Sequence, residues 1–250
     1  MRLGALLGPV VDAAQTRALA TQARTLADAG YTSLWTAQAI GRGFMMSDPF
    51  VTLAVAATVT EEIELGTAVV QAPLYAPADL AHRVLSLMQI AGPRLLLGVG
   101  AGSTEQDFAA LGRPYGERFR DFTARTRVLR ALLRDGRAGD VDLTPWPAVQ
   151  GGPPVLLGTW GKGVERAARD YDGWIASGAY RQPNEVIEAL GRYRGAGGGR
   201  AIVSTLQLGA RTDLGELRER FARFAEAGFD DAVVMFLPGG PAPAAVRALL

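Results

Sequence analysis

The turn GTWGKG, residues 158–163, carries the residue types that bind an anion. The apolar run PVLLGT at 154–159 precedes it and a helical pattern follows, so the turn joins a strand to a helix. Backbone N–H groups at a helix start point outward with partial positive charge, which favours a phosphate there. Thr159 adds a hydroxyl, and Lys162, the only lysine among 26 basic residues, adds a mobile charge. The pattern favours phosphate binding; the alternative is a solvated turn in a chain where lysine is simply rare.

A second glycine-rich segment, PGGPAP at residues 238–243, follows the last apolar run of the chain. Many α/β barrels bind phosphate in the loops after their last strands. Proline lacks the N–H group that would donate to an anion, and this segment has three prolines. We therefore prefer the turn at 158–163.

Residue types that perform acid–base, nucleophilic or metal chemistry are scarce. The chain has no cysteine, which excludes disulfides, zinc–thiolate sites, iron–sulfur clusters and cysteine nucleophiles. Its single histidine, His82, leaves little material for a histidine-rich metal site or a Ser–His triad. We predict no metal site.

Short apolar runs alternate eight times with helical patterns, and these elements must position the turn. The expected strands are bounded by Gly, Pro or Asp and cover residues 3–8, 32–37, 63–70, 94–100, 154–159, 172–177, 201–208 and 231–236. Asp48-Pro49 is typical of a helix start, an N-cap followed by proline at the first helical position. The expected helices cover 12–29, 48–59, 77–91, 117–135, 163–170, 183–194, 213–227 and 242–250.

Eight strand–helix units in series predict a parallel sheet with helices outside. Near 250 residues, closure into a single (β/α)8 TIM barrel is the economical solution, with residues 1–250 as one domain. The alternative is an open doubly wound sheet, but no G-x-G-x-x-G fingerprint follows the first strand. We see no linker or low-complexity tract that would mark a domain boundary.

Chemistry in such barrels lies at the carboxyl ends of the strands. No Asp or Glu clearly ends a strand, although Glu105 and Asp107 come one helical turn after the fourth, so catalysis by paired carboxylates is disfavoured. Redox chemistry carried by a bound organic cofactor needs fewer catalytic side chains from the protein. By elimination, we favour this kind of chemistry. The expected mouth residues are Gly8, Pro9, Gln38, Gln71–Tyr75, Gly100–Ser103, Thr159–Lys162, Ser177–Arg181, Ala210, Arg211 and Pro238–Gly240.

Bulk composition fits an ordinary globular chain that acts on a small molecule. The chain is 48% hydrophobic and 20% charged with a net charge of +1, so no strong field favours nucleic acid or an anionic membrane. No apolar run reaches about 18 residues, the length a membrane-spanning helix needs. The N-terminal apolar run is short, and we interpret it as a strand and not as a signal peptide. A cytoplasmic protein is expected.

The order and spacing of several segments resemble the luciferase-like monooxygenase superfamily. They are DPFVTLAVAATVTEEIELGTAVV from Asp48, PADLAHRVLSLMQIAGPRLLLGVGAGSTEQDFAALG from Pro77, and PPVLLGTWGKGVERAARDYDGW from Pro153. The likeness covers roughly residues 3–236. It implies a (β/α)8 fold, a flavin- or deazaflavin-dependent oxidoreductase or monooxygenase acting on a small organic substrate, and a homodimer formed through outer helices, for which 48–59 and 77–91 are candidates.

The resemblance also implies where the cofactor lies. The ring of FMN or of the deazaflavin coenzyme F420 would lie across the barrel mouth, against a bulge in the third strand with a cis peptide bond at Ala68–Val69. The sequence leaves the choice between FMN and F420 open. The implied cofactor-binding residues are Thr67, Ala68, Val69, Gly100, Ala101, Gly102, Thr159, Trp160, Gly161 and Lys162.

Two departures from the family pattern bear on catalysis. Relatives often carry His, Asp or Glu at the end of strand two, where this chain has Gln38, and an acid after strand four, where it has Ser103. Both can form hydrogen bonds, but neither is a good proton donor at neutral pH. They are our candidate catalytic residues. The alternatives are a non-catalytic flavin- or deazaflavin-binding protein, and a phosphate-ester isomerase or lyase, which would need a base at the mouth.

Overall fold

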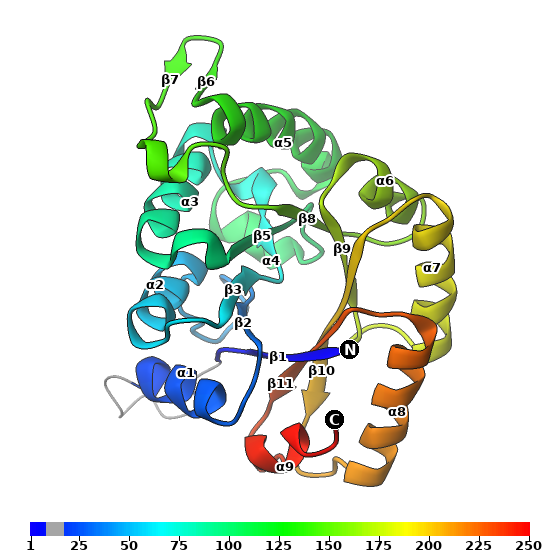
Figure 1. Ribbon diagram of the computed structural model, residues 1–250. Coiled ribbons are helices and arrows are strands. Elements are labelled where there is room, and N and C mark those ends of the chain that lie inside the picture. The colour runs from blue at the N-terminus through cyan, green and yellow to red at the C-terminus, as the bar shows by residue number, and fades with distance from the viewer. Residues whose placement is uncertain (9–17) are drawn as a thin grey trace.

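Eight parallel strands close into a barrel in the computed structural model, which describes residues 1–8 and 18–250 (Figure 1). The hydrogen-bonded order is β3-β2-β1-β11-β10-β9-β8-β5, and β3 also pairs with β5, which closes the ring. The short β4 continues β3 along β5. The strands are β1 Arg2–Leu6, β2 Ser33–Thr36, β3 Glu64–Thr67, β4 Val70–Gln71, β5 Leu95–Gly100, β8 Val155–Gly158, β9 Gly173–Ser177, β10 Arg200–Leu208 and β11 Asp231–Phe236.

Helices follow the strands and surround the barrel (Figure 1). Asp48 accepts from the N–H groups of Phe50 and Val51, so the predicted cap of the second helix is confirmed. The expected (β/α)8 barrel is confirmed, while the part of the first predicted helix before residue 18, and Pro9, lie outside the described residues. The helices are α1 Ala18–Asp28, α2 Pro49–Val59, α3 Pro77–Ala91, α5 Arg118–Asp135, α6 Gly163–Asp170, α7 Pro183–Gly195, α8 Leu214–Ala227 and α9 Pro243–Arg247.

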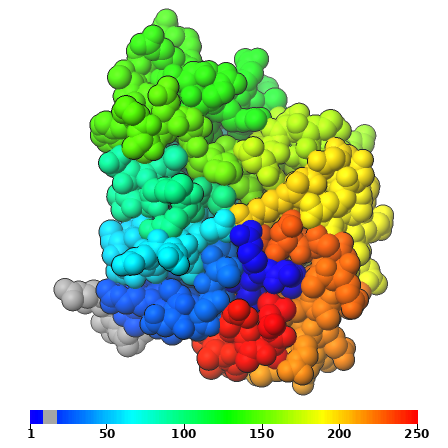
Figure 2. Space-filling view, in the orientation of Figure 1, coloured from blue at the N-terminus to red at the C-terminus, as the bar shows by residue number. Residues whose placement is uncertain are grey.

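The sequence patterns did not predict a short helix and a two-stranded hairpin. The short helix α4, Glu105–Ala110, lies between β5 and α5, and the strands β6, Arg137–Ala138, and β7, Val141–Asp142, form an antiparallel hairpin. Figures 1 and 2 show this hairpin projecting from the body of the molecule. Its strands have two residues each and are largely exposed, so they lack the apolar alternation that identifies a strand.

Side chains fill the barrel interior, as expected of this fold. Trp35 is the largest of them and is fully buried. Gly66 leaves room for it, since a Cβ at Gly66 would lie 2.4 Å from the indole ring. The interior cluster is Leu6, Trp35, Leu96, Leu156, Ile175, Ile202 and Val233.

A second, larger core lies between the strands and the surrounding helices. Trp174 belongs to it and packs against Tyr193 and Phe229, with ring centroids 5.4 and 6.1 Å away. The last helix closes the ring onto the first unit, because Arg247 on α9 donates to the carbonyl of Gly30 at 2.9 Å.

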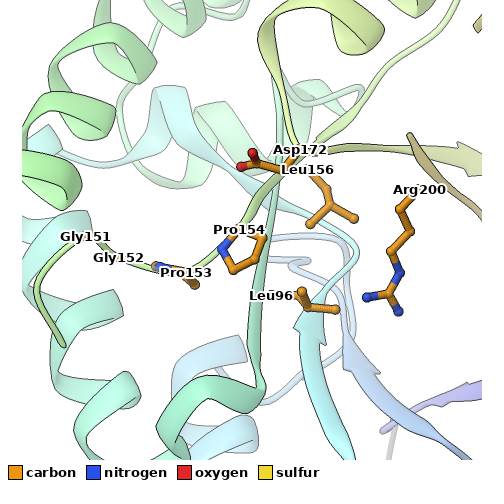
Figure 3. Close-up of a pocket in the computed structure, with 8 residues that line it drawn as sticks. All are labelled: Leu96, Gly151, Gly152, Pro153, Pro154, Leu156, Asp172 and Arg200. Atoms are coloured by element: carbon orange, nitrogen blue, oxygen red, sulfur yellow. The ribbon is translucent and has the colours of Figure 1, made fainter. Parts of the chain in front are cut away.

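The amino ends of the strands are closed by a network of four charged side chains. Arg200 binds Glu64 at 2.7 Å and Asp231 at 2.8 Å, and Arg2 binds the same two carboxylates at 3.3 and 2.9 Å. The Asp231 side chain is fully buried, and the two arginines are its ion-pair partners. A shallow pocket beside Arg200 is lined by Pro154, Leu96 and neighbours at this same end (Figure 3). It lies at the opposite end of the barrel from the expected mouth.

Candidate active site

The carboxyl ends of the strands hold an apolar floor that covers the barrel interior. Ala37, Ala68, Val69 and Met235 are partly buried and pack against the interior cluster. They come from the ends of three different strand units, so only the closed barrel brings them together. A partly buried apolar surface at the mouth suits an aromatic ring system.

The floor is interrupted at a cis peptide bond between Ala68 and Val69, and this prediction is confirmed. The expected continuous third strand is therefore two strands, β3 and β4, with residues 68 and 69 between them. The N–H of Ala68 donates to Thr36 at 2.7 Å, and the carbonyl of Val69 accepts from the N–H of Gln38 at 3.3 Å. Both residues are thus tied to the end of β2.

The side chain of Val69 lies between two glycines of neighbouring strands. A Cβ at Gly100 would lie 2.8 Å from one Val69 methyl, and a Cβ at Gly158 would lie 2.7 Å from the other. Thr67 is fully buried and donates its hydroxyl to Gly98 at 2.7 Å. The predicted cofactor contacts at residues 67–69 and 100 therefore share one packing unit at the mouth.

The turn after β8 presents donors to solvent at the mouth. Trp174 donates to the carbonyl of Thr159 at 3.1 Å, and Gly163 and Val164 donate to carbonyls within the turn. Within residues 1–8 and 18–250, the N–H groups of Gly161 and Lys162 have no hydrogen-bond acceptor. The turn is thus rigidly held, and two of its N–H groups remain available together with the Thr159 hydroxyl and the exposed Lys162.

Trp160 lies beside two side chains, Trp174 and Arg181. Its ring centroid lies 6.5 Å from that of the buried Trp174, and the guanidinium of Arg181 lies 4.8 Å from it on the loop after β9. An arginine over an indole face is favourable by the ring quadrupole. Trp160 therefore brings a second cation to the turn of Lys162.

Gln38 lies two residues after β2 and joins the end of β4 to Tyr75, which follows the short turn after β4. Its Oε1 accepts from the N–H of Gln71 at 2.8 Å, and its Nε2 donates to the Tyr75 hydroxyl at 2.8 Å. Gln71 itself is almost fully buried and donates to Asp107 at 2.5 Å. A chain of hydrogen bonds thus runs along one side of the mouth from Tyr75 to Asp107.

Asp107 is the mouth carboxylate that sequence reasoning placed only beyond strand four. It is fully buried on α4 and accepts from the N–H of Ile40 at 3.1 Å and from Nε of Arg42 at 2.8 Å, while the other Arg42 nitrogen binds Oδ2. Burial raises the pKa of Asp107, but the hydrogen bonds from Arg42, Ile40 and Gln71 outweigh it and hold the pKa below its ordinary value. Asp107 is therefore an ionised clamp and not a free base.

The remaining predicted residues lie along the loop after β5. Ser103 is exposed, and its carbonyl accepts from the Tyr115 hydroxyl at 3.0 Å. Ala101 and Gly102 are half-buried; Gly102 has a φ of +84°, and a Cβ there would lie 2.4 Å from the Gln71 side chain. Gly102 is thus required by its backbone conformation and by Gln71.

Among the described residues, no group of three His, Asp or Glu side chains is arranged to hold a metal ion. His82 lies exposed on α3, away from the strand ends. Over the same residues, no helix is both long and apolar enough to cross a membrane.

The sequence model for luciferase-like monooxygenases matches residues 1–227. The chain belongs to that family. An uncharacterized protein of Mycobacterium tuberculosis is 30% identical over 196 residues, which cover 74% of this chain and 68% of the relative. A putative coenzyme F420-dependent oxidoreductase of the same organism is 31% identical over 137 residues, covering 55% of this chain and 35% of that protein.

Solved structures share the fold of this luciferase-like protein. Monooxygenase RslO1 from Streptomyces bottropensis has a TM-score of 0.79 at 19% identity, covering 100% of this chain and 96% of that one. The oxygenating constituent of 3,6-diketocamphane monooxygenase from Pseudomonas putida, in complex with FMN, has a TM-score of 0.69 at 17% identity over 92% and 80%. The coenzyme F420-dependent tetrahydromethanopterin reductase from Methanopyrus kandleri has a TM-score of 0.71 at 15% identity over 99% and 96%.

Proposed function

We propose that this protein is a flavin- or deazaflavin-dependent oxidoreductase, of the monooxygenase or reductase type, that acts on a small organic substrate. The observation that carries the proposal is one mouth with an apolar floor at Ala68 and Val69 and a donor-rich turn at 159–162. Such a mouth suits a molecule with a flat ring and an anionic tail. Family membership supports the same chemistry.

The residues present fit such a cofactor. Ala68 and Val69 would lie against the ring, with Thr67 fixing their strand from below. The half-buried Ala101 and the residues beside it would border the ring on the side of β5.

The phosphate of the cofactor would be held at the turn after β8. The N–H groups of Gly161 and Lys162 and the hydroxyl of Thr159 are the donors, and α6 adds the positive end of its dipole. Lys162 is exposed and can swing onto an anion. The Trp160 ring contacts Arg181 and lies near Trp174.

When bound, a reduced flavin or deazaflavin supplies a hydride, and a reduced flavin also supplies the means to use oxygen. The chain's own residues bind, orient and shield. The floor would exclude water from one face of the ring, and the turn would hold the phosphate. Gln38 and Ser103 are the candidate polar groups toward the substrate, at the ends of β2 and β5.

A binding titration tests the proposal. Purified protein is titrated with FMN and, separately, with coenzyme F420, following cofactor fluorescence. Saturable binding of one of them supports the proposal and decides between the two cofactors, which the relatives leave open. Saturable binding of neither would contradict it.

Two other functions remain as alternatives. A non-catalytic cofactor carrier is motivated by Gln38 and Ser103 in place of acids, and it predicts binding without turnover. A phosphate-ester isomerase or lyase needs a free base, and the carboxylate at the mouth, Asp107, is bound by Arg42. That bond disfavours the second alternative.

A homodimer through α2 and α3 is part of the proposal. Val51 on α2 and Ile90 on α3 are 58% and 50% exposed, and large exposed aliphatic side chains favour an interface. Sedimentation equilibrium of wild type and Val51→Glu tests this. A monomer in the wild type, or an unchanged dimer in the variant, would contradict a dimer through this face.

A cytoplasmic location is also proposed, because the reduced cofactors that such an enzyme needs are regenerated there. Fractionation of source cells followed by immunoblotting tests it. The protein should appear in the cytoplasmic fraction, and its appearance in the membrane or secreted fraction would be the contrary result.

A further inference from the structure

The direction of the hydrogen bonds at Gln38 is fixed by chemistry. A backbone N–H can only donate, so the Gln38 atom 2.8 Å from the Gln71 N–H must be its oxygen. The amide nitrogen of Gln38 then faces the Tyr75 hydroxyl at 2.8 Å and donates to it. The Tyr75 oxygen is therefore an acceptor in this bond, and its own hydrogen is free for another partner.

The described part of the chain offers that hydrogen no acceptor. Tyr75 is nevertheless held firmly. Arg125 donates to its carbonyl at 2.7 Å, and its ring meets the ring of Phe50 edge-on with centroids 6.2 Å apart. The guanidinium of Arg83 lies 5.9 Å from the ring centroid. Because both its backbone and its ring are held by these contacts, the position of the Tyr75 hydroxyl is fixed before a ligand binds.

Three other polar groups at the ends of β3 and β5 are either already bonded or not held in place. The Thr67 hydroxyl donates to Gly98, and Asp107 is ionised by Arg42. Ser103 is exposed and no described contact fixes its hydroxyl. Gln38 lies beside the floor, because its N–H donates to Val69. The Tyr75 hydroxyl is therefore hydrogen-bonded to Gln38, which is itself bonded to Val69 of the floor.

We propose that Tyr75 is the hydrogen-bond and proton donor of this site, that Gln38 is its positioning residue, and that the substrate presents a carbonyl oxygen. This inference rests on the proposed function, which supplies the reductant. The bound reductant would supply a hydride to the carbonyl carbon or to a conjugated carbon, and the π electron pair would move onto the oxygen. The Tyr75 O–H bond breaks, its proton passes to that oxygen, and the phenolate regains a proton from water. The substrate gains two electrons and the cofactor loses two.

The charges around Tyr75 agree with a donor. Burial is the main cause that raises the pKa of Tyr75 to about 12; Asp48 on the cap of α2 and Asp79 on α3 add to it, while Arg83 and the bond from Gln38 oppose it. The phenol is therefore protonated at neutral pH. The bond from Gln38 stabilises the phenolate that forms when the proton leaves.

Infrared difference spectroscopy with cyclohex-2-enone as the probe tests the assignment without turnover. Protein loaded with whichever of oxidised FMN or F420 binds is compared as wild type, Tyr75→Phe, Gln38→Leu and Tyr171→Phe, the last being the tyrosine that ends α6 before β9 begins, at the amino end of the barrel. We expect a saturable shift of the carbonyl stretch to lower frequency in wild type and Tyr171→Phe. The shift should vanish in Tyr75→Phe and shrink in Gln38→Leu, which leaves the phenol in place.

Anaerobic oxidation of the reduced cofactor by the same probe gives a second readout. Tyr75→Phe should slow it about 100-fold and Gln38→Leu by less, at unchanged cofactor affinity. An equal carbonyl shift in wild type and Tyr75→Phe, or no saturable shift in wild type, overturns the inference. If neither cofactor binds wild type, the proposed function fails; if a cofactor binds all four proteins equally and the shift ignores Tyr75, only this inference fails.

Discussion

A methyl group of Val69 lies where a side chain at Gly158 would begin, with a Cβ there only 2.7 Å away. Gly100 faces the other Val69 methyl in the same way, at 2.8 Å. Val69 therefore lies between β5 and β8, and only glycine fits at positions 100 and 158 on these strands. The floor of the mouth and the donor-rich turn share this contact, because Gly158 immediately precedes Thr159.

Gly158→Ala should displace the floor. Contacts under 3.0 Å force Val69 or β8 to shift, and such overpacking costs about 1–3 kcal/mol of unfolding free energy. Chemical denaturation measures this cost, and titration measures the accompanying loss of cofactor affinity. Adding Val69→Ala removes the methyls and should restore most of the stability. Gly191→Ala on α7, where no atom lies within 4 Å, is the control. Full stability of Gly158→Ala alone would contradict the packing described.

Asp107→Asn should loosen the loop after β2 and change the response to acid. The Asp107 pKa is depressed in the folded state, so its stabilisation is full above the ordinary carboxyl pKa of about 4 and is lost as pH falls through the lower folded-state value. At pH 7 the variant should lose about 2 kcal/mol, less than for a fully buried pair because Arg42 is partly exposed. Unfolding free energy measured from pH 7 to pH 2 should fall less steeply in the variant. Parallel curves would be the contrary result.

Arg200→Met should destabilise the fold without changing cofactor affinity. The variant leaves the buried Asp231 with Arg2 alone, and breaking a buried pair costs about 3 kcal/mol. Thermal unfolding and cofactor titration are both measured. The network lies at the amino ends of the strands, away from the proposed site. A loss of cofactor affinity that accompanies the loss of stability would therefore contradict a cofactor site at the carboxyl ends. Arg218→Met, at an exposed position on α8, is the control.

Lys162→Met should weaken cofactor binding without unfolding the protein. The side chain is exposed and no described ion pair involves it, so stability should change by less than about 0.5 kcal/mol. Loss of one charge-assisted contact to phosphate should weaken affinity about tenfold at low salt, and less at high salt. Unchanged affinity at low salt would show that Lys162 does not contact the phosphate.

Apolar patterning predicted all eight barrel strands, because each is a short buried run bounded by turn residues. It could not predict the role of Asp107, whose partner Arg42 lies 65 residues away in the chain. The role of Gly158 could not be predicted for the same reason. The side chain that it accommodates is that of Val69, which lies between β3 and β4 and is far from Gly158 in the sequence. Helix α4 has six residues, too few for a helical period to register.

The link between Gln38 and Tyr75 was also beyond the sequence. From the sequence, Gln38 was notable only as a replacement for an acid or histidine, and Tyr75 was one of the expected mouth residues. The closed barrel places the ends of β2 and β4 side by side, and only then does the Gln71 N–H fix the orientation of Gln38. The role of the Tyr75 hydroxyl depends on Gln38 and Gln71, so the sequence around Tyr75 alone could not predict it.

The most direct test of the account compares each cofactor with its phosphate-free riboside. Wild-type protein is titrated with FMN and riboflavin, and with coenzyme F420 and its deazaflavin riboside. The account predicts that the phosphate-bearing member of one pair binds at least about tenfold more tightly, and that Lys162→Met reduces this ratio. Equal affinities within both pairs, or a ratio indifferent to Lys162 and to Thr159→Val, would contradict a phosphate site at the turn after β8.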